Sequence, residues 1–256
     1  MTALADILSA LEPIDGGFRG EIPVDWLQGR TAYGGLSSAL ALHAALACEP
    51  DLPPLRSALV AFIGPLAGTV TITARKLRRG RNAAYIEAAI ESDAGVGYRA
   101  TFVFMREMES AISFDRTQSA RLGPPAGTAR IHCGPANHFT ANFEFLDCAA
   151  PDTAGEWHRW ARLVHRDGLD PEVALIAIAD ALPPAAYQLH RGAAAMSSLT
   201  WQLNLLVPRP TTTDGWWLIQ SRTDRAVGGY SSQRMTMWSA DGTAIADAMQ
   251  GVAIFT

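Results

Sequence analysis

Two segments of the sequence carry apolar residues on every face when they are drawn as helices. Residues 33–46 consist mainly of glycine, alanine and leucine, and residues 173–182 mainly of alanine, isoleucine and leucine. A helix without a polar face has no side to present to water, so both should be buried. The second helix also has clear boundaries. Asp170 is placed to cap it, Pro171 occupies its first turn, and Pro183 follows its end.

Strand-like segments follow each of these helices. Threonines at alternate positions of residues 69–77 face one way and apolar residues the other, as in a half-buried strand. Turn sequences such as those at 93–95 and 240–242 separate consecutive segments as in hairpins. The predicted strands are 57–62, 69–77, 84–92 and 98–105 in the first half, and 199–206, 216–221, 230–238 and 244–255 in the second. Each half therefore reads as a buried helix followed by an antiparallel meander.

This repeated order predicts an α+β protein of two units, each with a curved sheet that wraps a helix. The region between the repeats has no hydrophobic period and contains Gly123, Pro124 and Pro125, which is typical of a linker. We expect a first unit at 1–106, a linker at 107–136 and a second unit at 137–256. A short amphipathic helix should open the chain, with apolar residues at helical spacing at Leu4, Ile7, Leu8 and Leu11.

Composition narrows the class of protein. With 48% apolar and 18% charged residues, the chain should bury a large core and an interface between copies, which predicts a homodimer or higher homo-oligomer. A net charge of −4 supplies no basic field, so nucleic acid is not an expected partner. Cys48, Cys133 and Cys148 do not form a disulfide framework, and no apolar run is long enough to span a membrane. The first fifteen residues contain no Lys or Arg and do not read as a signal peptide, so we expect a cytoplasmic protein.

Several short motifs, taken in order, resemble one family. Residues 26–30 (WLQGR) precede 33–35 (YGG) at the start of the first buried helix, and 77–81 (LRRGR) lies at the first hairpin. Residues 238–246 (WSADGTAIA) form the last hairpin, and Gln250 follows it. In this order and spacing, the sequence resembles the acyl-CoA thioesterase II-like, double hot-dog family.

The resemblance implies a tandem (double) hot-dog fold, with two curved antiparallel sheets that each wrap a central helix. It also implies hydrolysis of an acyl-CoA or related acyl thioester of lipid metabolism by water, without a metal, a cofactor or a covalent intermediate. In the family a carboxylate, a hydroxyl and a glutamine hold that water. By the resemblance, the glutamine maps onto Gln250, the hydroxyl onto Thr223 and the carboxylate position onto Thr200.

Thr200 departs from the family pattern, because a threonine cannot take a proton from water at neutral pH. A positioned base typically contributes about 10²–10⁴-fold to the rate. Asp224, beside Thr223, could replace the missing carboxylate. Asp180, at the end of the second apolar helix, is another acid, in a setting that should raise its pKa. If neither acid serves, the alternative function is a weak or inactive acyl-thioester-binding protein.

The start of the first buried helix is the candidate substrate-binding site. Backbone N–H groups near Gly34 and Gly35, next to Tyr33, point along the helix dipole and could hold the thioester carbonyl. The two glycines could equally serve close packing of the helix on the sheet.

Two further sets of residues have other interpretations. His132, Cys133 and His138 lie close in sequence but lack the spacing of metal ligands, so no metal site is predicted. The tryptophans of the second half are expected in the core or an interface, with one or two lining an acyl tunnel. They are Trp201, Trp216, Trp217 and Trp238.

Overall fold

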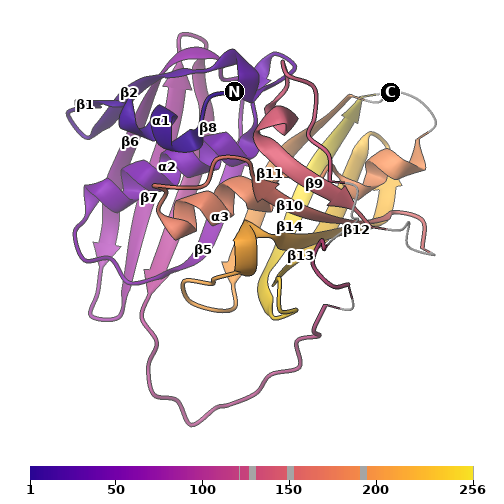
Figure 1. Cartoon of the computed structure of the whole chain (residues 1–256). Helices are drawn as coiled ribbons and strands as arrows, with labels where there is room; N and C mark the ends of the chain where they lie inside the picture. The colour runs from indigo at the N-terminus through magenta and orange to yellow at the C-terminus, as the bar shows by residue number, and fades with distance from the viewer. Residues whose placement is uncertain (121, 127–130, 149–152, 191–194, 256) are drawn as a thin grey trace.

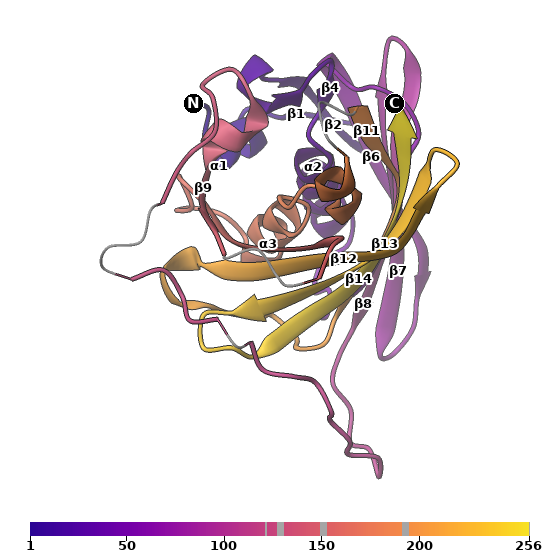
Figure 2. The same ribbon diagram turned by 90° about the vertical axis from the view of Figure 1, so that its right-hand side faces the viewer.

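The computed structural model describes residues 1–120, 122–126, 131–148, 153–190 and 195–255. Its main feature is one antiparallel sheet of twelve strands, in the order β1-β2-β6-β7-β8-β5-β11-β14-β13-β12-β10-β9. The sheet curves around two helices, α2 and α3, which lie in its concave side (Figure 1, Figure 2). A separate two-stranded ribbon joins β3 and β4.

The elements have the following bounds. The α-helices are α1 (Leu4–Ser9), α2 (Gly34–Cys48) and α3 (Pro171–Ala179). The strands of the first half are β1 (Glu12–Ile14), β2 (Gly17–Ile22), β3 (Leu27–Gln28), β4 (Thr31–Ala32), β5 (Leu55–Phe62), β6 (Gly68–Arg79), β7 (Ala83–Ser92) and β8 (Gly95–Met105). Those of the second half are β9 (Phe143–Asp147), β10 (Glu156–Leu163), β11 (Ala195–Leu205), β12 (Trp217–Val227), β13 (Tyr230–Ser239) and β14 (Ala244–Phe255).

The two halves of the sheet join where β5 pairs with β11. This seam runs antiparallel from Thr200 opposite Ala61 to Asn204 opposite Ser57. Each meander alone would leave this edge strand with unpaired backbone groups, and joining the edges satisfies both. The expected two sheets are therefore continuous with each other.

Both apolar helices are buried, as their sequences predicted. Helix α2 packs on β6, β7 and β8, and it also contacts α3. A Cβ at Gly35 would overlap the carbonyl oxygen of Ala177, so this glycine allows α2 to approach α3 closely. The Asp170 carboxylate caps α3 by accepting hydrogen bonds from the N–H groups of Glu172 and Val173, which confirms the predicted start.

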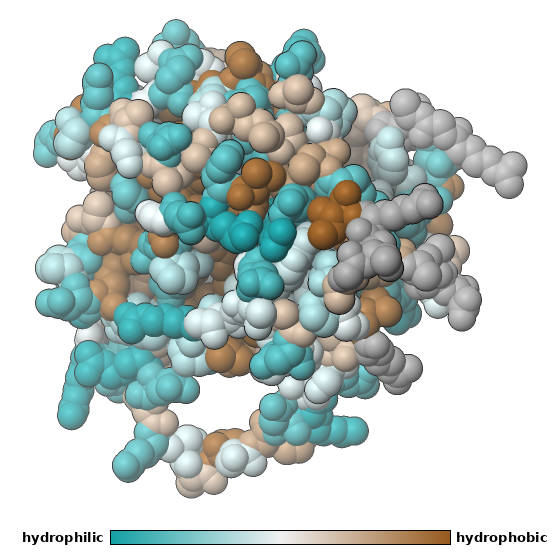
Figure 3. Space-filling model, in the orientation of Figure 1, coloured by the Kyte–Doolittle hydropathy of each residue, from teal (hydrophilic) through white to brown (hydrophobic). Residues whose placement is uncertain are grey.

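The predicted strands are all present, and four further strands of the large sheet were not predicted, nor was the ribbon of β3 and β4. Strands β1 and β2 extend the sheet at one end, and β9 and β10 extend it at the other. The stretch 106–120 lies outside the sheet and is almost entirely exposed, looping away from the body of the protein (Figure 1, Figure 3). Within the described residues, no helix combines the length and apolarity that crossing a membrane requires.

Candidate active site

A row of polar side chains crosses the concave face of the second half. Thr223 on β12 pairs with Gln233 on β13, and Gln233 pairs in turn with Gln250 on β14. Trp201 on β11 lies opposite Gln250 and continues the row. All four residues are buried. Because strand residues alternate between the two faces, a shared row in register brings these side chains together on the side that faces the helices.

The two glutamines form a directed chain of hydrogen bonds that ends at Asp180. The Ala185 backbone N–H can only donate, and it lies 2.9 Å from Oε1 of Gln233. Gln233 Nε2 must then donate to Oε1 of Gln250. Gln250 consequently presents Nε2 to Oδ1 of Asp180, at 3.0 Å. The backbone of the segment after α3 thus fixes the orientation of both amides.

Asp180 caps the C-terminus of α3 and lies against the start of α2. The backbone of Gly35 lies near its carboxylate, and a Cβ at Gly34 would lie only 2.6 Å from Oδ2. Protein surrounds the carboxyl group, and this burial raises its pKa from 3.8 to about 7, although the donors Gln250 and Gly35 act in the opposite direction. The residue as a whole nevertheless retains some accessible surface.

Two buried tyrosines border this carboxyl group. Tyr33 donates from its hydroxyl to the carbonyl of Ala177 at 2.7 Å, and Tyr98 donates to Oγ of Ser38 at 3.1 Å. Burial raises the pKa of both phenols, and the nearby charge of Asp180 raises them further. Both tyrosines therefore stay neutral at physiological pH, and Asp180 is the group of this cluster whose proton is exchangeable there.

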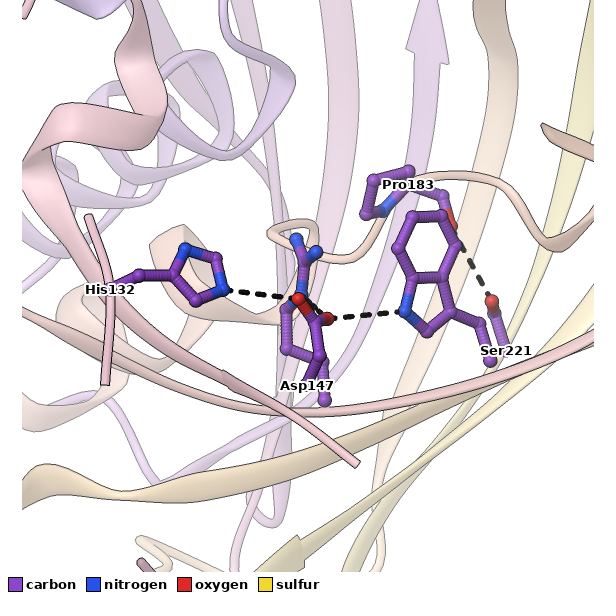
Figure 4. Close-up of polar contacts among 6 residues, drawn as sticks. His132, Asp147, Pro183 and Ser221 are labelled. Carbon is purple, nitrogen blue, oxygen red and sulfur yellow. Dashed lines mark hydrogen bonds and ion pairs between the residues drawn. The ribbon is translucent and has the colours of Figure 1, made fainter. Parts of the chain in front are cut away.

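A second polar cluster supports the end of the sheet and the segment after α3. Asp147 contacts Nε2 of His132 at 3.0 Å and accepts from Nε of Arg159 at 2.6 Å (Figure 4). Close by, Ser221 on β12 donates to the carbonyl of Pro183 at 3.5 Å (Figure 4). Pro183 lies three residues after Asp180, so this contact helps to hold the turn that presents the carboxyl group. Among the described residues, no three His, Cys, Asp or Glu side chains gather as metal ligands would.

The structure does not bring Thr200 to Gln250. Thr200 is exposed, and its hydroxyl and that of Tyr230 both lie next to Gly251 on the outer face of the sheet. The pleat explains this, because Thr200 precedes the inward-facing Trp201 and must point the other way. Thr200 also lines an outer groove of about 470 Å³ over β5, β11 and β14.

The other two predicted residues of β12 lie apart from the carboxyl group as well. Thr223 faces inward, but its hydroxyl is engaged by Ser231 at 2.7 Å and by the carbonyl of Ser232 at 2.9 Å. Asp224 is exposed and pairs with Arg222 at 2.9 Å. Of the sequence-predicted residues, Gln250, Gly34, Gly35 and Tyr33 surround Asp180, whereas Thr200, Thr223 and Asp224 do not contact it.

Gln233 was not predicted from the sequence. It alternates with apolar residues on a strand, as many exposed glutamines do, and only the register of β13 against β14 shows that it orients Gln250. Asp180 did carry a signal, because an acid within an apolar helix is unusual.

Two family models match the chain. The acyl-CoA thioesterase N-terminal domain matches residues 22–105, and the acyl-CoA thioesterase C-terminal domain matches residues 116–254. The chain belongs to the acyl-CoA thioesterase family. This confirms the resemblance inferred from the motifs at 26–35 and 238–246. No curated protein matches the sequence.

Solved structures show that the thioesterase family's hot-dog fold extends over the whole chain. A hot-dog protein of unknown function from Alicyclobacillus acidocaldarius has a TM-score of 0.86 at 21% identity, covering 100% of this chain and 99% of that one. The tesB protein of Mycobacterium avium subspecies paratuberculosis has a TM-score of 0.80 at 17% identity, covering 100% of both chains. An acyl-CoA thioesterase II, TesB2, from Mycobacterium marinum has a TM-score of 0.75 at 16% identity, covering 98% of this chain and 96% of that one.

Proposed function

We propose that the protein hydrolyses an acyl-CoA with Asp180 as the general base. The observation that carries this proposal is the enclosed Asp180 carboxyl group, held by Gln250 and by the N-terminus of α2 in a chain of the acyl-CoA thioesterase family. Family membership supports the substrate class. The contacts of Asp180 support its role, because a base must be held in place and able to change its protonation state near neutral pH.

The reaction needs only water and the thioester. The Asp180 carboxylate takes a proton from water as the water oxygen attacks the carbonyl carbon, and the carbonyl oxygen becomes negatively charged. When the C–S bond breaks, the electron pair leaves with sulfur, and Asp180 returns its proton to form coenzyme A. The carbonyl is restored in the carboxylic acid product, so atoms and charges balance without a cofactor.

The surroundings of Asp180 suit this role. A pKa of about 7 places the carboxyl group close to neutral pH, where a base is most effective. Gln250 donates to Oδ1, and Oδ2 faces Gly34. A Cβ at Gly34 would also lie 2.8 Å from the ring of Phe62, so the glycine lets the start of α2 lie close to the carboxyl group. Tyr33 precedes Gly34 as the N-cap residue of α2.

An acyl-thioester-binding protein without turnover is the second candidate, because Thr200 occupies the family's carboxylate position and points outward. Both candidates bind acyl-CoA, so only turnover separates them. The test incubates the protein with acyl-CoAs of graded chain length and a thiol reagent, with Asp180→Asn as the matched variant. Release of coenzyme A by the native protein and its loss in the variant support the enzyme. Binding without release supports the binding protein.

The tandem architecture belongs to the same proposal. A first hot-dog unit at 1–106, a linker at 107–136 and a second unit at 137–256 are supported by the seam between β5 and β11 and by the two family models. A homo-oligomer that uses the outer face is supported by the exposed apolar residues Leu59 and Met249 beside the outer groove. A cytoplasmic role in lipid metabolism is consistent with the substrate class.

A further inference from the structure

Trp201 is buried beside the proposed site and carries an unused hydrogen-bond donor. Only 1% of the residue is exposed, and it pairs with Gln250 on one side and with Val60 across the seam on the other. Its indole Nε1 is buried, and none of the described residues supplies an acceptor for it. It therefore stands next to the residue that holds Asp180, with a donor that the protein itself does not satisfy.

An unsatisfied donor of this kind needs an explanation. Most buried N–H groups in native proteins are paired, and leaving one unpaired costs free energy. Phenylalanine would fill much of the same space without an N–H group, so packing alone does not require tryptophan here. A donor that the protein leaves unpaired at a binding site is satisfied when a ligand brings an acceptor.

The carbonyl oxygen of the acyl thioester is a hydrogen-bond acceptor, and the proposed reaction places it near Trp201. In the proposed reaction the thioester carbonyl carbon lies beside the water at Asp180. The carbonyl oxygen is bonded to that carbon, so it also lies close to Gln250 and Trp201. The N–H groups at the start of α2 lie on the side of Asp180 that faces Gly34. Beside Gln250, Trp201 Nε1 is a buried donor without a partner among the described residues.

We propose that the Trp201 indole N–H donates a hydrogen bond to the carbonyl oxygen of the bound thioester and stabilises the negative charge that forms there during hydrolysis. This inference rests on the proposed function, and it adds a residue that touches the substrate. Loss of one donor of this type typically lowers kcat by about 10²–10³-fold. Because Trp201 Nε1 has no partner among the described residues, replacing its N–H by a group of the same shape should leave stability unchanged or raised.

The test compares Trp201→Phe with a matched control, Trp238→Phe. Trp238 belongs to a separate apolar cluster, and its Nε1 donates to the carbonyl of Gln118 at 2.7 Å. We expect Trp201→Phe to lower kcat about 10²–10³-fold and, because it leaves a cavity in the core, to lower thermal stability as well. Trp238→Phe should lower stability and leave kcat unchanged. Replacing Trp201 by benzothienylalanine, in which sulfur substitutes for N–H at nearly constant shape, provides a second variant if phenylalanine disturbs folding.

A binding experiment separates this inference from the proposed function. Two stable analogues of acyl-CoA are compared by calorimetry. One is a ketone that keeps the carbonyl oxygen, and the other is a thioether that lacks it. Native protein should prefer the ketone, and both Trp201 variants should lose that preference. A variant that keeps native kcat or the native preference overturns the role of Trp201. Absence of turnover in native protein overturns the proposed function instead, and the analogue preference then still decides the role of Trp201.

Discussion

Replacing Asp180 by asparagine should make the protein more stable and less active at neutral pH. Burial raises the pKa of the Asp180 carboxyl group from 3.8 to about 7, so the folded protein holds this proton more tightly than the unfolded chain does. Between those two pH values unfolding releases a proton, and the free energy of unfolding therefore falls as the pH rises. The two pKa values differ by about 3, which corresponds to a loss of about 4 kcal/mol by pH 8.

Asparagine has nearly the same size but no charge, so the variant escapes this loss. Its carbonyl oxygen can still accept from Gln250. The asparagine side chain offers one acceptor atom where aspartate offers two, and the loss of that acceptor should cost about 1 kcal/mol of stability. Asp180→Asn should thus gain about 3 kcal/mol over the native protein at pH 8 and lose this advantage at pH 4. Its hydrolysis of acyl-CoA should be slower by about 10²–10⁴-fold, since the base is absent.

Urea unfolding of both proteins at pH 4, 6 and 8, together with kcat on one acyl-CoA, measures the two effects. Asp224→Asn serves as the control, because that carboxylate is exposed and should show neither effect. A difference in stability that does not grow with pH would show that the carboxyl group of Asp180 is not held in its neutral form. Native activity in Asp180→Asn would remove Asp180 from the mechanism.

Three further substitutions test the surroundings of the carboxyl group. Gln250→Leu removes a hydrogen-bond donor that favours the ionised form of Asp180. The midpoint of the pH profile of kcat/KM should therefore move upward from about 7. An unchanged midpoint would show that Gln250 does not influence the base. Gly34→Ala places a Cβ 2.6 Å from Oδ2 of Asp180, so it should slow hydrolysis and lower stability by about 1–3 kcal/mol. Gly123→Ala is the control, because a Cβ there meets nothing within 4 Å, and it should change neither property. Turnover and thermal unfolding of both variants measure the two effects. Thr200→Asp adds a carboxylate on the outer face of the sheet and should leave kcat unchanged. A rate of coenzyme A release about ten-fold higher than that of the native protein would contradict the placement of Thr200.

Local patterns predicted most of the fold. The all-apolar composition of α2 and α3 and the alternation in β6 are properties of short segments, and they are visible without knowledge of tertiary contacts. Strands β9 and β10 were not predicted because β10 carries Arg159 and Arg162, whose charges hide the alternation. In the structure Arg159 is buried against the ring of Phe145 and paired with Asp147, which no pattern in one strand reveals.

The site was predicted only as far as local motifs reach. Gln250 and the glycines at the start of α2 follow recognisable sequence features. The position of Thr200 depends on register, where a shift of one residue reverses the face, and a bulge between Ser198 and Thr200 lies just before it. Asp180 meets Gln250 through contacts between a helix and a distant strand, and such contacts are set by packing of the whole chain.

The seam between β5 and β11 and the contacts between α2 and α3 join segments that are far apart in the sequence. Contacts within each meander are local in sequence and form quickly, whereas the seam joins segments far apart and must close a long loop first. The hydrogen bond from Tyr33 to Ala177 spans 144 positions, and that from Gln250 to Asp180 spans 70. We therefore expect both meanders to form before the residues of the proposed site meet.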